Sequence, residues 1–520
     1  MRIQKRTILY DASILACGNL LLQALGFFYR ILLSHFAGAE GLGVYRLVNS
    51  VYLVLNAGCL SGVTMACSRL TAASRARGER KQTGAVLRLS FSAFFMLCTA
   101  CTAVILLLRE PISIKLLGDG RCARAFPFLA LCLALTGVEN IFKALFIGLE
   151  KMQYTAASEV GEQLVRICAV GVLLFQYRGN EYGTIAMLIF AGMVVSEIFS
   201  ALLLTWLFHK NIPGVSLHTQ INGAMAGQFF RIALPLSASA LIGNLISSAG
   251  AILLPQRLML AGMTYEQALS ALGVISGMAL PLLLLPVALV SSVNTALLPA
   301  VTAAQARGNR ARVCALTGRA ITTVGLIAFP ATAVLVPLAP RLSELFFRQP
   351  LTPEYVSLLG AVAIASYYQM VTAGLLNALG LQHLSVVTGV LAECMQIVLL
   401  YRWCALPSMG VYGYLLAMLL TSAGAFGVNV CILHRRSRFA LHPFRRFGVP
   451  ILCGATLFGW TRFFYGFFRN AFRTEAGALL CTLIGAAALY TLVLRLLGVR
   501  LLHYLGQRIE KTQFPRICTW

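Results

Sequence analysis

Residues 61–80 read SGVTMACSRLTAASRARGER, and residues 291–310 read SSVNTALLPAVTAAQARGNR, 230 positions further along the chain. In both stretches an apolar run leads into a basic Ala-Arg-Gly turn. A fainter echo links Gly148-Leu149-Glu150-Lys151 to Gly380-Leu381-Gln382-His383. We interpret the repeat as a duplication with the same handedness, a plan that places a binding site between two halves. The alternative is that loops rich in Ala, Arg and Gly resemble each other by composition alone.

The composition around the repeat is that of a membrane protein. Of 520 residues, 59% are hydrophobic and 11% are charged, and the mean hydropathy is +0.81. A soluble domain carries about 25% charged residues, so this chain has too few to cover a water-facing surface. Apolar stretches of about 20 residues recur along the chain, and each is long enough to cross the hydrocarbon core as a helix. The runs are continuous rather than alternating, which excludes a β-barrel.

We therefore predict an all-α polytopic membrane protein with about fourteen transmembrane helices. The predicted spans are 11–36, 44–68, 84–108, 124–149, 157–175, 183–208, 226–254, 268–299, 314–339, 354–380, 382–403, 410–433, 447–467 and 475–497. The repeat groups them into two pseudo-symmetric lobes of six helices, residues 1–220 and 221–434. Residues 435–520 are expected to hold two further helices and a cytoplasmic tail.

The net charge of +25 has its arginines in short loops between apolar spans. With the N-terminus inside, the predicted cytoplasmic segments hold about twice as many lysines and arginines as the other side, which favours an even number of spans and two cytoplasmic ends. Such loops suit anionic membrane lipids, and the absence of one basic face argues against nucleic acid. We expect a multi-pass protein of a bacterial cytoplasmic membrane, and a monomer.

The sequence shows no motif typical of an enzyme. It has no P-loop, HExxH or GxSxG pattern and no nucleotide-binding domain, so we expect no catalytic residues and no cofactor. Most of the fifteen cysteines lie in apolar runs, where cysteine behaves as a small hydrophobic residue. Neither disulfides nor a metal site are expected.

The informative residues are charges inside spans, because such charges usually face a cavity or a partner. Arg30 lies late in the first span, Arg46 follows across the turn, and Arg257 ends the seventh span. A polyanion such as a pyrophosphate needs several cations, and these three would supply them. For Arg30 and Arg46 the alternative is that the side chains extend to the lipid headgroups.

Three acids in spans are candidates for cation coupling or for a cavity lining: Glu162, Glu197 and Glu393. Glu162 stands four residues before Arg166, and Glu139 stands four residues before Lys143, so each pair shares a helix face and has a structural interpretation as well. Glu197 and Glu393 are isolated in the sequence. A neighbouring hydroxyl group would be enough to satisfy either one.

Several segments resemble the stage V sporulation protein B branch of the polysaccharide flippases, within the multidrug/oligosaccharidyl-lipid/polysaccharide (MOP, MATE-like) exporter superfamily. The segments are Gly26–Ile31 with Gly38–Tyr45, Ser158–Arg166, Val274–Leu282 with Pro286, and Asn294–Ala300. The chain departs from the branch at Arg46, where glutamine is expected, and at Ser50, where proline is expected.

The resemblance implies a fold of two lobes with alternating access. It also implies a substrate such as lipid II or another undecaprenyl-pyrophosphate-linked saccharide, moved in the manner of MurJ-type flippases during cell-wall or spore-envelope synthesis. Relatives place arginines in the central cavity, which supports Arg30 and Arg257. Two alternatives remain: a cation-coupled multidrug exporter of the MATE type, and a scaffold that binds other envelope-synthesis proteins without transport.

Overall fold

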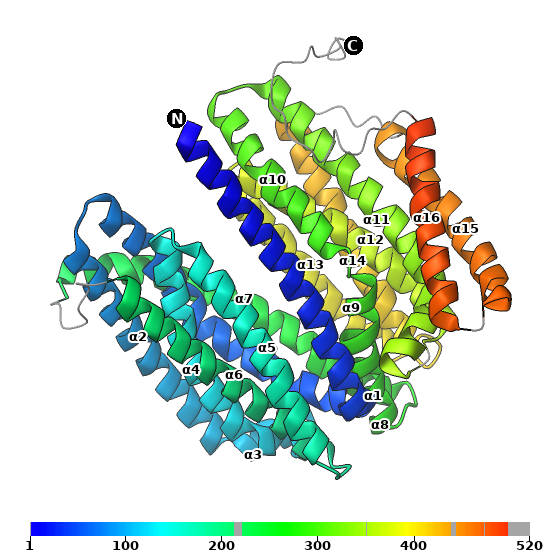
Figure 1. Cartoon of the computed structure of the whole chain (residues 1–520). Helices are drawn as coiled ribbons and strands as arrows, with labels where there is room; N and C mark the ends of the chain where they lie inside the picture. Colours follow the sequence, from blue (N-terminus) through cyan, green and yellow to red (C-terminus); the bar gives the residue numbers. More distant parts are fainter. Residues whose placement is uncertain (1, 213–220, 350, 438–443, 473, 498–520) are drawn as a thin grey trace. The chain divides into compact units, whose positions relative to one another are not determined.

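The computed structural model describes residues 2–212, 221–349, 351–437, 444–472 and 474–497, and every regular element in these ranges is helical (Figure 1). The elements are α1 Arg2–Ala76, α2 Arg80–Leu107, α3 Arg109–Pro111, η1 Ile112–Leu117, η2 Gly120–Ala125, α4 Phe126–Gly148, α5 Met152–Gln176, α6 Tyr182–Asn211, α7 Gly223–Leu260, α8 Tyr265–Gly273, η3 Val274–Ala279, α9 Leu280–Leu283, α10 Val287–Ala306, α11 Arg310–Phe347, α12 Pro353–Ala378, α13 Gln382–Trp403, α14 Gly410–Ser437, η4 Phe444–Gly448, α15 Val449–Ala471 and α16 Glu475–Leu496. The prediction of an all-α fold is confirmed. The predicted cytoplasmic tail after residue 497 and residues 213–220 of the linker lie outside the described residues.

Thirteen stretches of the described residues are long and apolar enough to cross a membrane. The difference from the predicted spans has three causes. The first two predicted spans form the single element α1, and α5 is absent from the thirteen because its charged residues lower its hydropathy. The eighth predicted span is interrupted at Leu284–Pro286, so it contributes two stretches.

α1 consists of two helices that meet at Gly38. This residue has φ 64° and ψ −174°, a conformation open almost only to glycine because it has no Cβ. In a straight helix Tyr29 and Tyr45 would be about 24 Å apart along the axis. Their side chains instead lie close enough to interact electrostatically, so the second half of α1 folds back beside the first.

The chain divides into two compact units. Unit 1 comprises residues 1–278 and 400–410, and within it α1 packs against α2, α4, α5, α6, α7 and α8. Unit 2 comprises residues 279–399 and 411–520, and within it α11 packs against α10, α12 and α15. The two units are defined by the contacts that residues make within the chain. The lobes 1–220 and 221–434 and the C-terminal part 435–520 rest on the repeat and stay a prediction.

The repeated segments adopt the same local structure. α1 ends at Ala76 and α2 begins at Arg80, whereas α10 ends at Ala306 and α11 begins at Arg310. The amide of Gly78 donates to the carbonyl of Arg75, and the amide of Gly308 donates to that of Gln305. Both glycines have positive φ, 73° and 65°, as helix-ending residues often do.

The fainter echo also has a structural counterpart, but the register of the sequence comparison was wrong by two residues. The residue of positive φ that ends α4 is Glu150, and the one that follows α12 is Gly380. These two turns are again 230 positions apart, and Lys151 and Leu381 make equivalent amide-to-carbonyl bonds. Matching Gly148 to Gly380 aligned a shared glycine rather than the shared backbone conformation.

Candidate functional site

Arg30 and Arg46 come from the two halves of α1, each eight positions from Gly38. The fold-back at Gly38 therefore places them at the same level, close enough for their charges to repel. Arg30 is exposed, whereas Arg46 is half-buried and its Nε atom is buried without a hydrogen-bond acceptor. The predicted pair of arginines is thus brought together by the turn.

Arg257 lies one turn before the end of α7, and its guanidinium carbon is 3.2 Å from the centre of the Tyr401 ring. At this distance the ring face attracts the cation and fixes its position. α7 runs antiparallel to the second half of α1, because the Gly62 amide meets Ser237 Oγ at 3.1 Å and Ser248 Oγ donates to the Ser50 carbonyl at 3.0 Å.

This antiparallel packing sets the level of the arginines. Arg46 lies one turn beyond Ser50, and Arg257 lies about 13 Å beyond Ser248, both in the direction of Gly38. The three candidate arginines are therefore found toward the same end of unit 1, which we call the Gly38 end. None of the three forms an ion pair with an acidic side chain within the described ranges.

Arg121, another arginine of unit 1, has acidic partners. At the Gly38 end, Arg121 of η2 bridges Asp119 at 2.9 Å and Glu40 at 2.8 Å, and it lies over the ring of Tyr182. The bridge attaches the start of the second half of α1 to the η1–η2 segment. The sequence carries no local signal of this cluster, because its members are 61 or more positions apart except for Asp119 and Arg121.

The same end contains a close approach between α1 and α8. A Cβ atom built on Gly43 would lie 2.4 Å from the carbonyl oxygen of Leu269, and one built on Gly273 would lie 2.0 Å from that of Ala39. Only glycine allows backbones to approach so closely. The contact joins the start of the second half of α1, within predicted lobe 1–220, to α8, which lies in predicted lobe 221–434.

A second cluster of charges is buried among α4, α5 and α6, which pack side by side in unit 1 (Figure 1). Its acids are Glu139, Glu162 and Glu197, which are 2%, 8% and 3% exposed, and we call them the carboxyl triad. Its cations are Lys143 and Arg166. Both i,i+4 pairs expected from the sequence are present, Lys143 with Glu139 and Arg166 with Glu162.

Further ion pairs connect the three helices. Lys143 Nζ lies 3.2 Å from Glu162 Oε2, and Arg166 Nη2 lies 3.2 Å from Glu197 Oε1. Arg166 Nε also donates to Ser196 Oγ at 3.2 Å. The position of Glu197 in the sequence indicated an isolated acid. In the structure it has a partner, which the neighbouring helix supplies. Glu159 is a fourth, partly exposed acid, 3.8 Å from Lys143.

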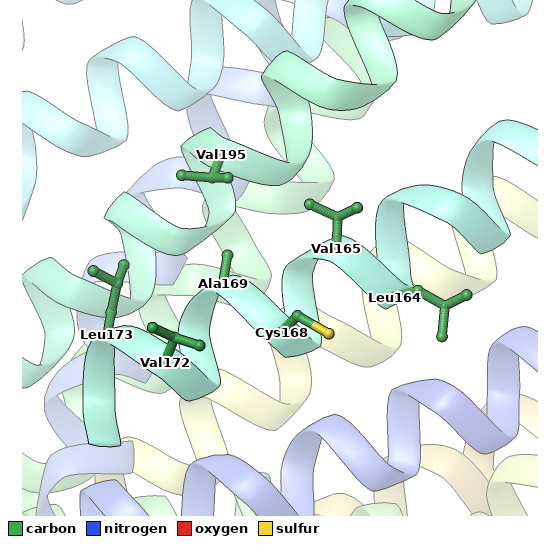
Figure 2. Close-up of a pocket in the computed structure, with 7 residues that line it drawn as sticks. All are labelled: Leu164, Val165, Cys168, Ala169, Val172, Leu173 and Val195. Atoms are coloured by element: carbon green, nitrogen blue, oxygen red, sulfur yellow. The ribbon is translucent and has the colours of Figure 1, made fainter. Parts of the chain in front are cut away.

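The opposite face of α5 is apolar. Figure 2 shows a shallow pocket lined by Leu164, Val165, Cys168, Ala169, Val172 and Leu173 of α5 with Val195 of α6. α5 thus has a polar face toward the protein and an apolar face away from it. This is the arrangement that a hydrocarbon environment favours, because lipid cannot satisfy charged groups.

Glu393 lies near the middle of α13 in unit 2 and is exposed. Within the described residues it makes no hydrogen bond or ion pair. It belongs to a different unit from the carboxyl triad, and its role in coupling stays a prediction.

Two thiols approach each other in unit 1. Cys59 Sγ of α1 lies 3.6 Å from Cys101 Sγ of α2, and Cys98 stands three residues before Cys101. The Cys-X-X-Cys spacing of Cys98 and Cys101 is the signal in the sequence for this cysteine cluster, so a sequence interpretation without such a pair is wrong. Both thiols are free in the structure.

Comparison with known proteins agrees with this architecture. A family model described as polysaccharide biosynthesis protein matches residues 8–305. Stage V sporulation protein B of Bacillus subtilis (strain 168) is 26% identical over 477 residues, which cover 86% of this chain and 88% of that protein.

Two solved structures show the same fold. A multidrug resistance MATE family transporter of the MOP superfamily, in an inward-facing conformation, has a TM-score of 0.67 at 16% identity, over 81% of this chain and 98% of that one. The lipid II flippase MurJ, in an inward closed conformation, has a TM-score of 0.66 at 14% identity, over 92% of this chain and 98% of that one.

Proposed function

The chain belongs to the polysaccharide biosynthesis protein family, and from this premise we propose that it flips an undecaprenyl-pyrophosphate-linked saccharide, such as lipid II or a polysaccharide precursor, across the bacterial cytoplasmic membrane. It is a multi-pass membrane transporter and not an enzyme. Its partners under this proposal are the lipid-linked saccharide, anionic membrane lipids and other envelope-synthesis proteins. Both termini are proposed to be cytoplasmic.

The proposal is carried by one observation: within the described residues, none of Arg30, Arg46 and Arg257 has an acidic partner. An arginine inside a membrane protein is costly unless an anion or water compensates it. Arg121 and Arg166 have acidic partners, whereas these three have none among the described residues. A pyrophosphate with its several oxygens is a suitable partner, because guanidinium groups bind phosphate through paired hydrogen bonds.

Alternating access needs a contact that forms and breaks. The close approach of Gly43 to Leu269 and of Gly273 to Ala39 is a candidate for such a contact at the Gly38 end. We propose that it separates when the headgroup site opens to that side. An interface in which two backbones pack closely can separate and re-form as a unit, which suits a two-state transition.

The proposal is tested by binding and flipping in liposomes. Purified protein is reconstituted into liposomes with a fluorescent lipid II analogue. Flipping moves the labelled lipid between the leaflets, so the fraction of label exposed on the outside should change with time. Arg30→Ala, Arg46→Ala and Arg257→Ala should each weaken binding about tenfold or more, since each removes charge-assisted hydrogen bonds. Arg178→Ala is the matched control: Arg178 is exposed in the loop between α5 and α6 and should leave binding unchanged.

The alternatives give different results. Efflux of cationic dyes that persists in the three arginine variants would indicate a MATE-type exporter. Arginine variants that lose lipid binding but still complement a deletion strain would indicate a scaffold. Competition by neutral lipids as strong as that by pyrophosphate lipids would show that the arginines do not recognise the headgroup.

A further inference from the structure

The buried charges among α4, α5 and α6 do not balance when every acid is ionised. The carboxyl triad carries three negative charges, and Lys143 and Arg166 carry two positive ones. Glu159 is left out of this balance because its side chain is 37% exposed and is not enclosed with the others. An uncompensated charge in a protein interior is strongly unfavourable, and a carboxylate in that position is neutralised by a proton instead.

The arrangement of oxygen atoms indicates where that proton lies. Both oxygens of Glu162 are occupied by the two cations. Glu139 Oε2 and Glu197 Oε2 are buried and have no hydrogen-bond partner. One oxygen of each of the three side chains lies within 4.8 Å of the corresponding oxygens of the other two. Two carboxyl groups this close can form a hydrogen bond only when one of them holds a proton.

We propose that Glu139, Glu162 and Glu197 form a proton-binding site that shares one proton between the free oxygens of Glu139 and Glu197. The proton comes from water, binds one of these oxygens and is donated to the other. With one proton bound, the triad and its two cations have no net charge. The inference does not depend on the proposed flippase function, because it concerns the interior of unit 1 and no substrate.

A proton fits the site better than a metal ion does. A hard cation such as Ca²⁺ or Mg²⁺ takes about six or more oxygen ligands. The triad leaves two oxygens without a partner, and the positive heads of Lys143 and Arg166 contact the same carboxylates. The ammonium group of Lys143 and the guanidinium group of Arg166 repel a further cation. A proton, in contrast, is covalently bound to one carboxyl oxygen and hydrogen-bonded to another, so it fits beside them.

The site has a connection to the helix that bears the candidate arginines. The titratable and charged groups near the triad are Tyr29, Tyr45 and Tyr52 of α1, Cys132 and Lys143 of α4, Glu159 and Arg166 of α5. Tyr29 Oη is buried without a hydrogen-bond partner and precedes Arg30. A change in the charge of the triad therefore changes the electrostatic potential at α1.

The second repeat has no copy of this site. Positions 230 residues further along hold Gln369, Ala373, Ala392, Gln396 and Gly427 in place of Glu139, Lys143, Glu162, Arg166 and Glu197. The fold itself thus does not require these charges, since equivalent helices form without them. The site is a property of the first half alone.

Infrared spectroscopy and proton release test the site on the purified full-length protein. At pH 7 the wild type should show the carbonyl band of a buried carboxylic acid, and Glu139→Gln and Glu197→Gln should each remove it. Glutamine keeps the shape and supplies a fixed donor to the facing carboxylate, so the variants should fold. Glu79→Gln is the matched control, because Glu79 is exposed and should leave the band unchanged.

Unfolding in weak buffer should release about one more proton from the wild type than from Glu139→Gln, since an exposed glutamate is ionised at pH 7. Because the folded protein holds a proton that the unfolded chain loses, the thermal midpoint should fall as pH rises from about 6 to about 8, and the slope should flatten in both variants. A wild type without the band, or a band that persists in both variants, overturns the proposal. So does stabilisation by Na⁺ over choline that is lost in Glu139→Gln, which would mean that a metal ion occupies the triad.

Discussion

Arg166 on α5 lies 3.2 Å from Glu197 on α6, and this ion pair joins two helices that also share a buried hydrogen bond between the Ser158 and Ser200 hydroxyl groups. The arginine also pairs with Glu162 on its own helix and donates to Ser196 Oγ on α6. One partly buried guanidinium therefore satisfies groups on two helices. A charge with this many partners is stable in the interior, whereas any member left alone is not.

Arg166→Ala should lower the free energy of unfolding by about 3–5 kcal/mol, because it leaves Glu197 and Glu162 without their partner in a buried site. Thermal unfolding in detergent measures the change. Arg178→Ala, at an exposed loop position, should have no measurable effect.

The double variant Arg166→Ala/Glu197→Ala provides the decisive comparison. Each single variant leaves one charge without its partner, and the double variant removes both charges. Its loss in free energy of unfolding should therefore be smaller than the sum of the losses of the two single variants. Strictly additive losses would show that the two side chains do not interact in the membrane protein.

Most of the fold could be predicted from the sequence, because a helix in lipid must be long and apolar, and both properties are local. The departures are also local in origin. α5 is less apolar than its neighbours because its inward face is charged, and the eighth span is interrupted at Leu284–Pro286, where the chain contains a proline. The repeat was visible in its basic turns, since a turn of positive φ favours glycine.

The site could be predicted only in part. Pairs four residues apart, such as Glu162 with Arg166, follow from helix geometry. The Arg166–Glu197 pair spans 31 positions, and the Arg121–Glu40 pair spans 81. Neither separation leaves a periodic signal, because such pairs depend on which helices become neighbours. The same limit applies to Arg30 and Arg46, whose proximity results from the fold-back at Gly38.

Gly38→Ala should destabilise the protein by about 1–3 kcal/mol, because φ 64° with ψ −174° is strained for any residue with a Cβ. No atom lies within 4 Å of the added methyl group, so the cost is conformational rather than a clash. Gly26→Ala is the matched control in the same helix: its surroundings are also open, its φ is not positive, and alanine there should be neutral or stabilising. Equal thermal midpoints for the two variants would contradict the assigned turn.

Gly43→Ala and Gly273→Ala should disrupt the contact between α1 and α8, because each added methyl group would meet a backbone carbonyl oxygen at 2.4 Å or less. We expect the free energy of unfolding to fall by about 1–3 kcal/mol, as it does when a well-packed protein core is overpacked. Hydrogen–deuterium exchange should increase in residues 112–125 and 256–273, which adjoin this contact. Unchanged exchange in both variants would mean that the backbones separate without cost and that the contact is not tight.

Substitutions of Tyr401 test whether Arg257 must be held in position to bind a phosphate group. Tyr401→Phe keeps the aromatic face under the guanidinium, so the affinity for a pyrophosphate lipid should not change. Tyr401→Leu removes the face, and with it a contribution of about 0.5–2 kcal/mol, so affinity should fall by a factor of about two to thirty. Native mass spectrometry of the bound lipid measures both. If Tyr401→Leu instead binds more tightly, the ring competes with the phosphate for Arg257, and the arginine must leave Tyr401 before the headgroup binds.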